Sequence, residues 1–231
     1  MSKIGLIGAM DEEVAVIKEW MTDIQQESVA GCEFFVGKLD GVDVVLQKSG
    51  IGKVNAALST TLLLNNYAPD KVINIGSAGG FGPDLEVGDV VISSDVVHHD
   101  VDVTVFGYEL GQVPNLPATY EADAQLKTCA VNAVETLGKV KAKIGLIGSG
   151  DVFMCEAGRV AQAREAFPTM IAVEMEAAAV AQVCYKFETP FVVVRSLSDV
   201  ADKESPASFE EYLKVAAENS SRMIREMIKE L

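Results

Sequence analysis

Short apolar runs alternate along this chain with longer segments in which apolar residues recur at the spacing of a helix. The runs 3–9, 71–80, 142–151 and 189–199 each pass into a polar or glycine-containing loop, and a further strand region spans 87–100. Their apolar residues are nearly continuous, which is typical of strands buried on both faces of a sheet. With helices between the strands, the pattern predicts an α/β fold with a mixed, mostly parallel sheet flanked by helices.

Helical spacing marks the segments between these runs. The first of them, 11–24, would place four apolar residues on one face: Val14, Ile17, Met21 and Ile24. The same reasoning predicts helices over 55–67, 122–137, 156–166 and 208–230. These lengths suit helices that cover a sheet.

Two further strands, 32–39 and 42–50, are joined by the dipeptide Asp40-Gly41. Such a dipeptide between two apolar runs is a strong signal for a tight hairpin. The segment 106–120 is the least regular part of the chain, and we expect it to have a functional or contact role.

Composition narrows the class of protein. The chain has 231 residues, 49% of them hydrophobic, and no linker divides it, so we expect one domain over 1–231. The net charge of −15 argues against nucleic acid as a partner, because no basic stripe is present to meet phosphates.

No run reaches the roughly 18 uncharged apolar residues of a membrane span, and the first residues lack the apolar core of a signal peptide. The four cysteines are scattered without a C-x-x-C pair: Cys32, Cys129, Cys155 and Cys184. Buried free thiols in a reducing cytoplasm are the expected state. We therefore expect a cytoplasmic protein.

Polar residues follow several of the apolar runs, where an open α/β sheet binds its ligands beyond the carboxyl ends of strands. They are Glu12, Glu13, Ser77, Asp151, Glu174, Glu176, Arg195, Ser198 and Asp199, and the aromatic residue Phe153 follows the same run as Asp151. Each also has an ordinary structural explanation. Acids at the start of a helix favour its dipole, serine suits turns, aspartate can cap a turn and phenylalanine can belong to the core. For Glu12 and Glu13 taken alone, the structural explanation is the stronger.

Glu174 and Glu176 resist that explanation better, because they interrupt the apolar segment 171–183, and a buried carboxylate needs a partner. Residues two apart point to the same side of a strand but diverge on a helix. We favour a helix that begins near residue 174, with Glu176 facing a cleft.

Other motifs fail on inspection. The segment 49–54 resembles a phosphate-binding loop, but Val54 stands where Ser or Thr is required. His98 and His99 are adjacent and cannot easily share one ion, so we predict no metal. There is no G-x-S-x-G elbow, which argues against hydrolysis through an activated serine.

Six segments carry a family resemblance: IGAMDEEV, SGIGKVNAA, IGSAGG, GDVFM, AVEMEAAA and VRSLSDVAD. In this order, from residue 4 to about residue 212, they resemble the bacterial 5′-methylthioadenosine/S-adenosylhomocysteine nucleosidases. These enzymes form a branch of the purine nucleoside phosphorylase superfamily. The resemblance therefore implies that family's single-domain α/β fold.

The resemblance also implies a reaction without any cofactor. Water cleaves the N9–C1′ bond of a 5′-thioadenosine and releases adenine and a 5-thioribose, and 5′-deoxyadenosine is a further implied substrate. The acid that protonates adenine N7 falls on Asp199, with Ser198 orienting it and Arg195 nearby. The residue that activates water falls on Glu13, and Glu176 would bind the ribose hydroxyls.

The same resemblance implies a set of residues that contact the substrate. They are Met175 against the sugar, Phe153 and Met154 at adenine, Ser77 near the water, and Ile51, Met10 and Phe209 around the sugar and alkylthio group, with Ala78 and Gly79 as further substrate-binding residues. Family members are usually homodimers, so residues 106–114 would reach the pocket of a partner subunit. Glu174 has no implied role, and we expect a structural hydrogen bond for it.

Two rival functions remain open. A phosphorylase would use phosphate instead of water, but the adjacent carboxylates of MDEEV would repel it. A nucleoside-binding or sensor domain would use the same scaffold without catalysis. The joint presence of Glu13, Glu176 and Asp199 speaks against it, since a binder needs no acid that activates water.

Overall fold

The computed structural model describes residues 2–82, 84–138, 140–200 and 205–231, and for residues 200 and 205–211 it describes the backbone alone. Its strands are β1 (Lys3–Gly8), β2 (Thr22–Val29), β3 (Cys32–Leu39), β4 (Val42–Lys48), β5 (Lys71–Gly80), β6 (Val90–His98), β7 (Tyr120–Glu121), β8 (Ala142–Ser149), β9 (Met170–Glu174) and β10 (Phe191–Val200). Its helices are α1 (Asp11–Trp20), α2 (Lys53–Tyr67), α3 (Ala124–Leu137), α4 (Ala157–Ala166), α5 (Ala177–Lys186) and α6 (Ser205–Ile228), with a 3-10 turn, η1, at Thr104–Phe106.

All ten of these strands belong to one mixed sheet, in the order β10-β6-β8-β9-β5-β1-β4-β3-β2, with β7 beside β6. Strand β5 also pairs with β10, so β5, β10, β6, β8 and β9 close into a ring. The pairs β1–β4, β1–β5, β5–β10, β6–β8 and β8–β9 are parallel, and the others are antiparallel. The predicted α/β fold with a mixed sheet is confirmed.

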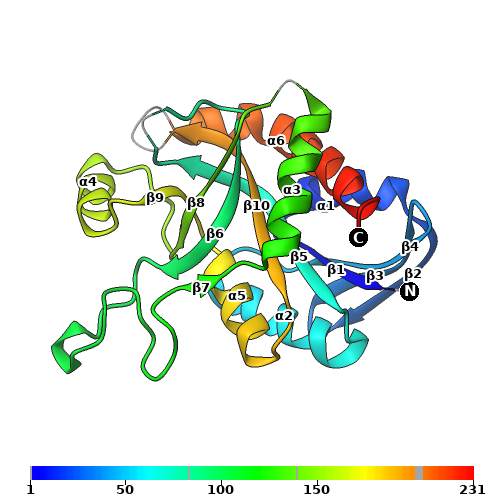
Figure 1. Ribbon diagram of the computed structural model, residues 1–231, viewed down its shortest axis with the longest axis horizontal. Helices are drawn as coiled ribbons and strands as arrows, with labels where there is room; N and C mark the ends of the chain where they lie inside the picture. The colour runs from blue at the N-terminus through cyan, green and yellow to red at the C-terminus, as the bar shows by residue number, and fades with distance from the viewer. Residues whose placement is uncertain (1, 83, 139, 201–204) are drawn as a thin grey trace.

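Helices cover both faces of the sheet (Figure 1). On one face α1, α3 and α6 pack against alternate strand residues such as Leu6, Ile73 and Val194. On the other face α2 and α5 pack against the intervening residues, among them Ile7 and Val193. Strands β1, β5 and β10 are therefore buried on both sides, as their continuous apolar sequences predict. Each such Ile, Val or Leu contributes about 1.5–3 kcal/mol by leaving water.

The predicted hairpin is confirmed. Strands β3 and β4 pair with Leu39 opposite Val42. Asp40 and Gly41 between them both have positive φ angles, 47° and 89°. A two-residue turn of this type needs that geometry, which glycine adopts without strain and which aspartate tolerates.

The predicted helix over 11–24 is too long. Helix α1 ends at Trp20, because Met21 is already extended (φ −73°, ψ 150°), and the following residues form β2. Strand β2 pairs with β3 at the edge of the sheet and is exposed along most of its length. Ile24 therefore lies on this edge strand, not on the buried face of the helix. In the described part of the chain, no helix is both long and apolar enough to cross a lipid bilayer.

Candidate active site

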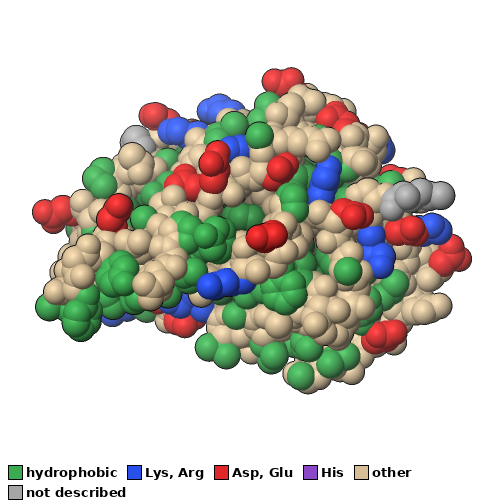
Figure 2. All heavy atoms as spheres, turned by 60° about the horizontal axis from the view of Figure 1, so that its bottom comes forward, with side chains coloured by type: hydrophobic (Ala, Val, Ile, Leu, Met, Phe, Trp, Pro, Cys, Tyr) green, Lys and Arg blue, Asp and Glu red, His purple; other side chains and the backbone are tan. Residues whose placement is uncertain are grey.

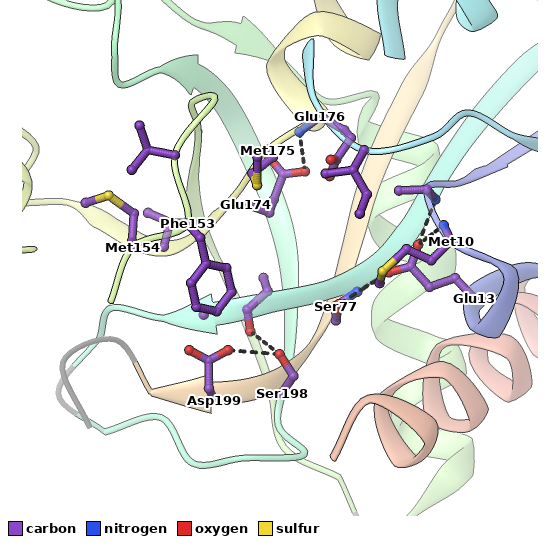
Figure 3. Close-up of a pocket in the computed structure, with 16 residues that line it drawn as sticks. Met10, Glu13, Ser77, Phe153, Met154, Glu174, Met175, Glu176, Ser198 and Asp199 are labelled. Atoms are coloured by element: carbon purple, nitrogen blue, oxygen red, sulfur yellow. Dashed lines mark hydrogen bonds between the residues drawn. The ribbon is translucent and has the colours of Figure 1, made fainter. Parts of the chain in front are cut away.

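A cavity of about 190 Å³ opens where β1, β5, β9 and β10 end and the loop after β8 begins (Figure 3). Twelve of the residues predicted for the site line it: Met10, Glu13, Ile51, Ser77, Ala78, Gly79, Phe153, Met154, Met175, Glu176, Ser198 and Asp199. Arg195 is not among the lining residues. The side chain of Phe209 is outside the described part of the structure. The structure therefore brings residues from six distant segments to one hollow.

Glu13 is held in place by donors from two elements. Its Oε2 accepts hydrogen bonds from the backbone N–H of Ala9 at 2.7 Å and of Met10 at 3.2 Å. Its Oε1 accepts from the N–H of Ser77 at 3.0 Å and from the Ser77 hydroxyl at 3.3 Å. Four donors suit an ionised carboxylate, which accepts hydrogen bonds only. Glu13 is thus a fixed acceptor at the cavity wall.

The close approach of Glu13 to β5 requires a glycine. A side-chain carbon added at Gly76 would lie 2.7 Å from Glu13 Oε1, and the backbone there has φ 150°. The neighbouring Glu12 is exposed on the outside of α1 and does not line the cavity. Of the two acids at the start of this helix, only Glu13 reaches the site. The dipole explanation suffices for Glu12.

Asp199 and Ser198 both line the cavity although they are neighbours on one strand. Strand β10 has an irregularity there, since Leu197 pairs with Ala78 and Asp199 pairs with Gly79, which leaves Ser198 as an extra residue. Such a bulge turns the strand locally and re-aims its side chains. The prediction placed these residues in a loop after the strand, whereas β10 continues through them to Val200.

The Asp199 carboxyl is 3% exposed and accepts a hydrogen bond from Ser198 Oγ at 2.9 Å. Burial raises the pKa of Asp199 above its ordinary value, and the Ser198 hydrogen bond opposes this rise only in part. A carboxyl with a raised pKa can hold a proton and donate it. In Figure 3 Asp199 lies below the ring of Phe153, on the side opposite Glu176.

Glu176 is the N-cap residue of α5. The helix itself begins at Ala177, three residues beyond the predicted start near 174. Its Oε1 accepts a hydrogen bond from the N–H of Gly52, at the start of α2, at 2.8 Å. Burial, followed by the nearby negative charge of Glu174, raises the pKa of Glu176 to about 8. The prediction that Glu176 faces the cleft is confirmed.

Glu174 ends β9, and its carboxylate is saturated with donors. They are Ser149 Oγ, Arg195 Nη2 at 2.7 Å, the N–H of Glu176 at 3.0 Å and the N–H of Ala177 at 2.9 and 3.1 Å. Burial opposes its ionisation most strongly, yet the charge of Arg195 and these hydrogen bonds together hold the pKa of Glu174 below its ordinary value. The expected structural hydrogen bond of Glu174 is confirmed.

Arg195 is 2% exposed, and its guanidinium lies between two acceptors under the site. Nη2 donates to Glu174 Oε2 and, at 2.7 Å, to Asn74 Oδ1. Asn74 in turn donates to the carbonyl of Ile7 at 2.9 Å. Arg195 therefore neutralises Glu174, and the structure gives it no contact with Asp199.

The remaining walls are apolar. Phe153 and Ile51 are 42% and 51% exposed and stand at the open side, whereas Met154 is buried. The lining residues not predicted as site residues are Ala9, Val152, Val173 and Glu174. The first three are apolar, and a lone small or β-branched residue gives no signal in a sequence. An apolar cavity with a few convergent polar groups is typical of a small-molecule site.

One predicted polar residue, Asp151, does not line the cavity and binds the start of α2 instead. Asp151 Oδ1 accepts from the N–H of Lys53 at 2.8 Å, and Lys53 Nζ pairs with Asp100 at 2.5 Å. The segment 49–54, which is not a phosphate-binding loop, therefore binds three carboxylates of the protein itself, since Gly52 holds Glu176 and Lys53 holds Asp151 and Asp100. In the described residues, no group of three or more His, Cys, Asp or Glu side chains is arranged to hold a metal ion.

Comparisons with known proteins agree with this geometry. The family described as the phosphorylase superfamily matches residues 3–229. A 5′-methylthioadenosine/S-adenosylhomocysteine nucleosidase from Marinomonas sp. (strain MWYL1) is 70% identical over 229 residues, which are 99% of each chain.

Two solved structures are similar over the whole chain. The nucleosidase of the same description from Colwellia psychrerythraea 34H, in complex with adenine, has a TM-score of 0.98 at 53% identity, covering 100% of this chain and 96% of that one. The one from Neisseria meningitidis, in complex with methylthio-immucillin-A, has a TM-score of 0.98 at 47% identity, covering 100% of both chains.

Proposed function

The chain belongs to the phosphorylase superfamily and, within it, to the 5′-methylthioadenosine/S-adenosylhomocysteine nucleosidases, and on this premise we propose that it hydrolyses the N-glycosidic bond of both nucleosides. The products are adenine and the corresponding 5-thioribose. The proposal depends on one observation: Glu13, Glu176 and Asp199 line the same cavity, and each carboxyl has different neighbours. The three carboxyls can then perform three different tasks.

Asp199 is the proton donor of the proposed reaction. Its raised pKa lets it carry a proton to adenine N7 as the N9–C1′ bond breaks, so that the electron pair of that bond leaves on a neutral base. Ser198 orients the carboxyl through its hydrogen bond. Phe153, next to Asp199, stacks on the adenine ring, and the backbone of Met154 meets the edge of the base.

Glu13 is the acceptor for the proton of the attacking water. The oxygen of water bonds to C1′ while one of its protons passes to the Glu13 carboxylate, and Ser77 lies beside that carboxylate. General acid–base help from one positioned group contributes about 10²–10⁴-fold to the rate. Ala78 and Gly79 also line the cavity, on the side of Ser198 and Asp199.

Glu176 binds the ribose. Above its raised pKa of about 8, its ionised carboxylate accepts hydrogen bonds from the 2′- and 3′-hydroxyls and stabilises the positive charge that develops on the sugar. Met175 packs against the sugar, and Met10, Ile51 and Phe209 surround the alkylthio end. Arg195 takes part indirectly, by balancing the charge of Glu174 beneath the site.

The rival reaction with phosphate is disfavoured by the charge of the cavity. Among the described residues, those lining it include three glutamates and one aspartate but no lysine or arginine. Phosphate binding needs cations or several free N–H donors. Adenine release from methylthioadenosine should therefore proceed at the same rate with and without phosphate. Release that requires phosphate, with ribose-1-phosphate as product, would reverse the assignment.

The same assay separates an enzyme from a binding domain. If the purified protein binds adenosine thioethers but releases no adenine over hours, the binding function is correct. Parallel assays with methylthioadenosine, S-adenosylhomocysteine and 5′-deoxyadenosine test the substrate range. We expect cleavage of all three, because the acid, the base and the ribose contact do not depend on the 5′-substituent.

We also propose a homodimer in which residues 106–114 approach the partner's pocket. Large apolar side chains are exposed on α2 and in or beside this loop, among them Val54, Leu58, Val105 and Phe106. Figure 2 shows apolar side chains gathered on the face toward which α2 and this loop project. Light scattering on the wild type and on Phe106→Glu tests the proposal. A monomeric wild type with full activity would contradict it.

A further inference from the structure

Helix α5 is capped by residues outside it. Its N-cap residue is Glu176, whose side chain makes no capping hydrogen bond. The backbone N–H groups of Glu176 and Ala177 donate to the Glu174 carboxylate, and that of Ala178 donates to Ser149 Oγ at 2.8 Å. The first N–H groups of a helix lack partners within it, so an outside acceptor must satisfy them.

Ser149 and Glu174 act as one unit. Ser149 ends β8 and Glu174 ends β9, and these residues lie opposite one another in the parallel pair of strands. The Ser149 hydroxyl donates to Glu174 Oε1 while it accepts from Ala178. Both residues are buried, at 0% and 9% exposure. The ends of two strands thus hold the start of the helix.

Glu174 lines the cavity but has no free acceptor for a substrate. Oε1 accepts from Ser149 Oγ and the N–H of Ala177, and Oε2 accepts from Arg195 and the N–H groups of Glu176 and Ala177. Arg195 also balances its charge. Glu174 can therefore affect a ligand only through the groups that it holds.

The group it holds most directly is Glu176. An N-cap glutamate would ordinarily turn back toward the first N–H groups of its own helix, which attract a carboxylate. Here those N–H groups are already occupied. The Glu176 side chain is free to point into the cavity, where the N–H of Gly52 fixes one of its oxygens.

We propose that Ser149 and Glu174 are positioning residues for the binding of ribose. By capping α5 in place of Glu176, they keep the Glu176 carboxylate directed at the sugar hydroxyls. The inference rests on the proposed function of Glu176 and adds two residues that act through it. The inference predicts that loss of Ser149 or Glu174 weakens the binding of nucleosides but not of adenine. Adenine has no ribose hydroxyls for Glu176 to bind.

The test compares two ligands on three variants. Ser149→Ala removes the hydroxyl that links Ala178 to Glu174, and Glu174→Gln places an NH₂ group among N–H donors. Ser59→Ala is the matched control, since Ser59 is buried in α2 and its hydroxyl donates only to the carbonyl of Ala56. KM for methylthioadenosine and the inhibition constant for adenine are measured on each, with thermal unfolding as a check of folding.

We expect KM for methylthioadenosine to rise about tenfold in Ser149→Ala and in Glu174→Gln, as the loss of a hydrogen bond to a charged group commonly produces. The inhibition constant for adenine should change less than about twofold. In Glu174→Gln, Glu176 loses the neighbouring negative charge that helps to raise its pKa. The acidic limb of the plot of kcat/KM for methylthioadenosine against pH should therefore shift to lower pH. Ser59→Ala should match the wild type for both ligands.

Equal weakening of methylthioadenosine and adenine would overturn the inference, and so would unchanged values for both. Failure of both variants to fold would assign the two residues a purely structural role and would also overturn it. A wild-type protein that releases no adenine contradicts the proposed function instead. The two failures are therefore distinguishable.

Discussion

Glu174 and Glu176 stand two residues apart, are almost equally buried, and behave in opposite ways. Their exposures are 9% and 7%. The pKa of Glu174 is held below its ordinary value by Arg195 and several hydrogen bonds, against the effect of burial, whereas burial raises the pKa of Glu176 to about 8. Glu174 has five hydrogen bonds from four groups, and the only hydrogen bond found for the Glu176 carboxylate in the described structure comes from Gly52.

The difference teaches that burial alone does not identify a working carboxylate. The number of donors around it separates a structural acid from one that is available to a ligand. Glu174, Ser149, Arg195 and Asn74 form a hydrogen-bonded layer beneath the site, in which the Glu174 carboxylate is saturated with donors. Glu176 and Asp199 belong to the wall above it, where acceptor or proton capacity is left for the substrate, whereas Glu13 in the same wall already accepts four hydrogen bonds.

The largest effect is expected at the acid of this wall. Asp199→Asn removes the proton donor but keeps the shape, so kcat for methylthioadenosine should fall by about 10²–10⁴-fold or more while its dissociation constant changes only a few-fold. Rapid-quench kinetics and calorimetry measure the two quantities. Asp123→Asn is the control, because Asp123 caps α3 away from the cavity. Wild-type turnover in Asp199→Asn would remove this residue from the mechanism.

Glu13→Gln tests the acceptor on the opposite wall. Its amide cannot take a proton from water, and its NH₂ group would face the N–H donors of Ala9 or Ser77. We expect kcat to fall by about 10²–10⁴-fold. Glu12→Gln makes the same chemical change one residue away on the exposed side of α1 and should keep full activity. Equal losses in the two variants would point to the helix dipole instead of the carboxylate at Glu13.

Glu176→Gln should stabilise the ligand-free protein as pH rises. The folded pKa of about 8 lies above the ordinary value of 4.5. The contribution of the protonated carboxyl to stability is therefore complete below about pH 4.5 and is lost as pH rises to about 8. Glutamine does not titrate, so the variant should gain up to about 4 kcal/mol over the wild type at high pH and little at low pH.

Denaturant unfolding at a series of pH values measures this gain. The matched change Glu174→Gln should lower stability at the same pH, because it leaves Arg195 without its charged partner. If both variants changed stability in the same direction, the conclusion that the two glutamates affect stability in opposite ways would be wrong.

The smallest effect is expected for a carboxylate that is paired but exposed. Asp40 in the β3–β4 hairpin accepts from Arg225 of α6 at 2.7 and 2.9 Å, and Arg225 is 42% exposed at its side chain. Solvent weakens such a pair, so Arg225→Gln should leave the free energy of unfolding nearly unchanged in denaturant unfolding. Activity should be unchanged. A loss of stability as large as that of Glu174→Gln would show that an exposed ion pair stabilises this protein as much as a buried one.

Much of the fold could be predicted from the sequence because burial on both faces makes strands apolar throughout. Strands β1, β5 and β10 and the hairpin of β3 and β4 were recognisable for that reason. Strand β2 was not, since its sequence TDIQQESV lies exposed at the edge of the sheet and has no alternation of apolar residues. Its first residues were absorbed into the predicted helix 11–24, which is therefore too long.

The cavity could be predicted only as far as side chains follow strands. Glu13 and Glu176 follow β1 and β9, whereas Ser77 and Asp199 lie near the ends of β5 and β10, and the structure brings all four together. The bulge at Ser198 and the capping of α5 by Ser149 depend on pairing between distant segments. No local pattern records that pairing. For the same reason Arg195 could not be assigned to the layer below the site from the sequence alone.

The different protonation of Glu174 and Glu176 is tested most directly by NMR titration of the protein with ¹³C-labelled glutamate carboxyls. Each resonance is assigned by its loss in Glu174→Gln or Glu176→Gln. In the ligand-free protein, the Glu176 signal should titrate with a midpoint near pH 8, and the Glu174 signal should show an ionised carboxylate down to below pH 4.5. A Glu176 midpoint at its ordinary value, or protonation of Glu174 before Glu176, would contradict the account.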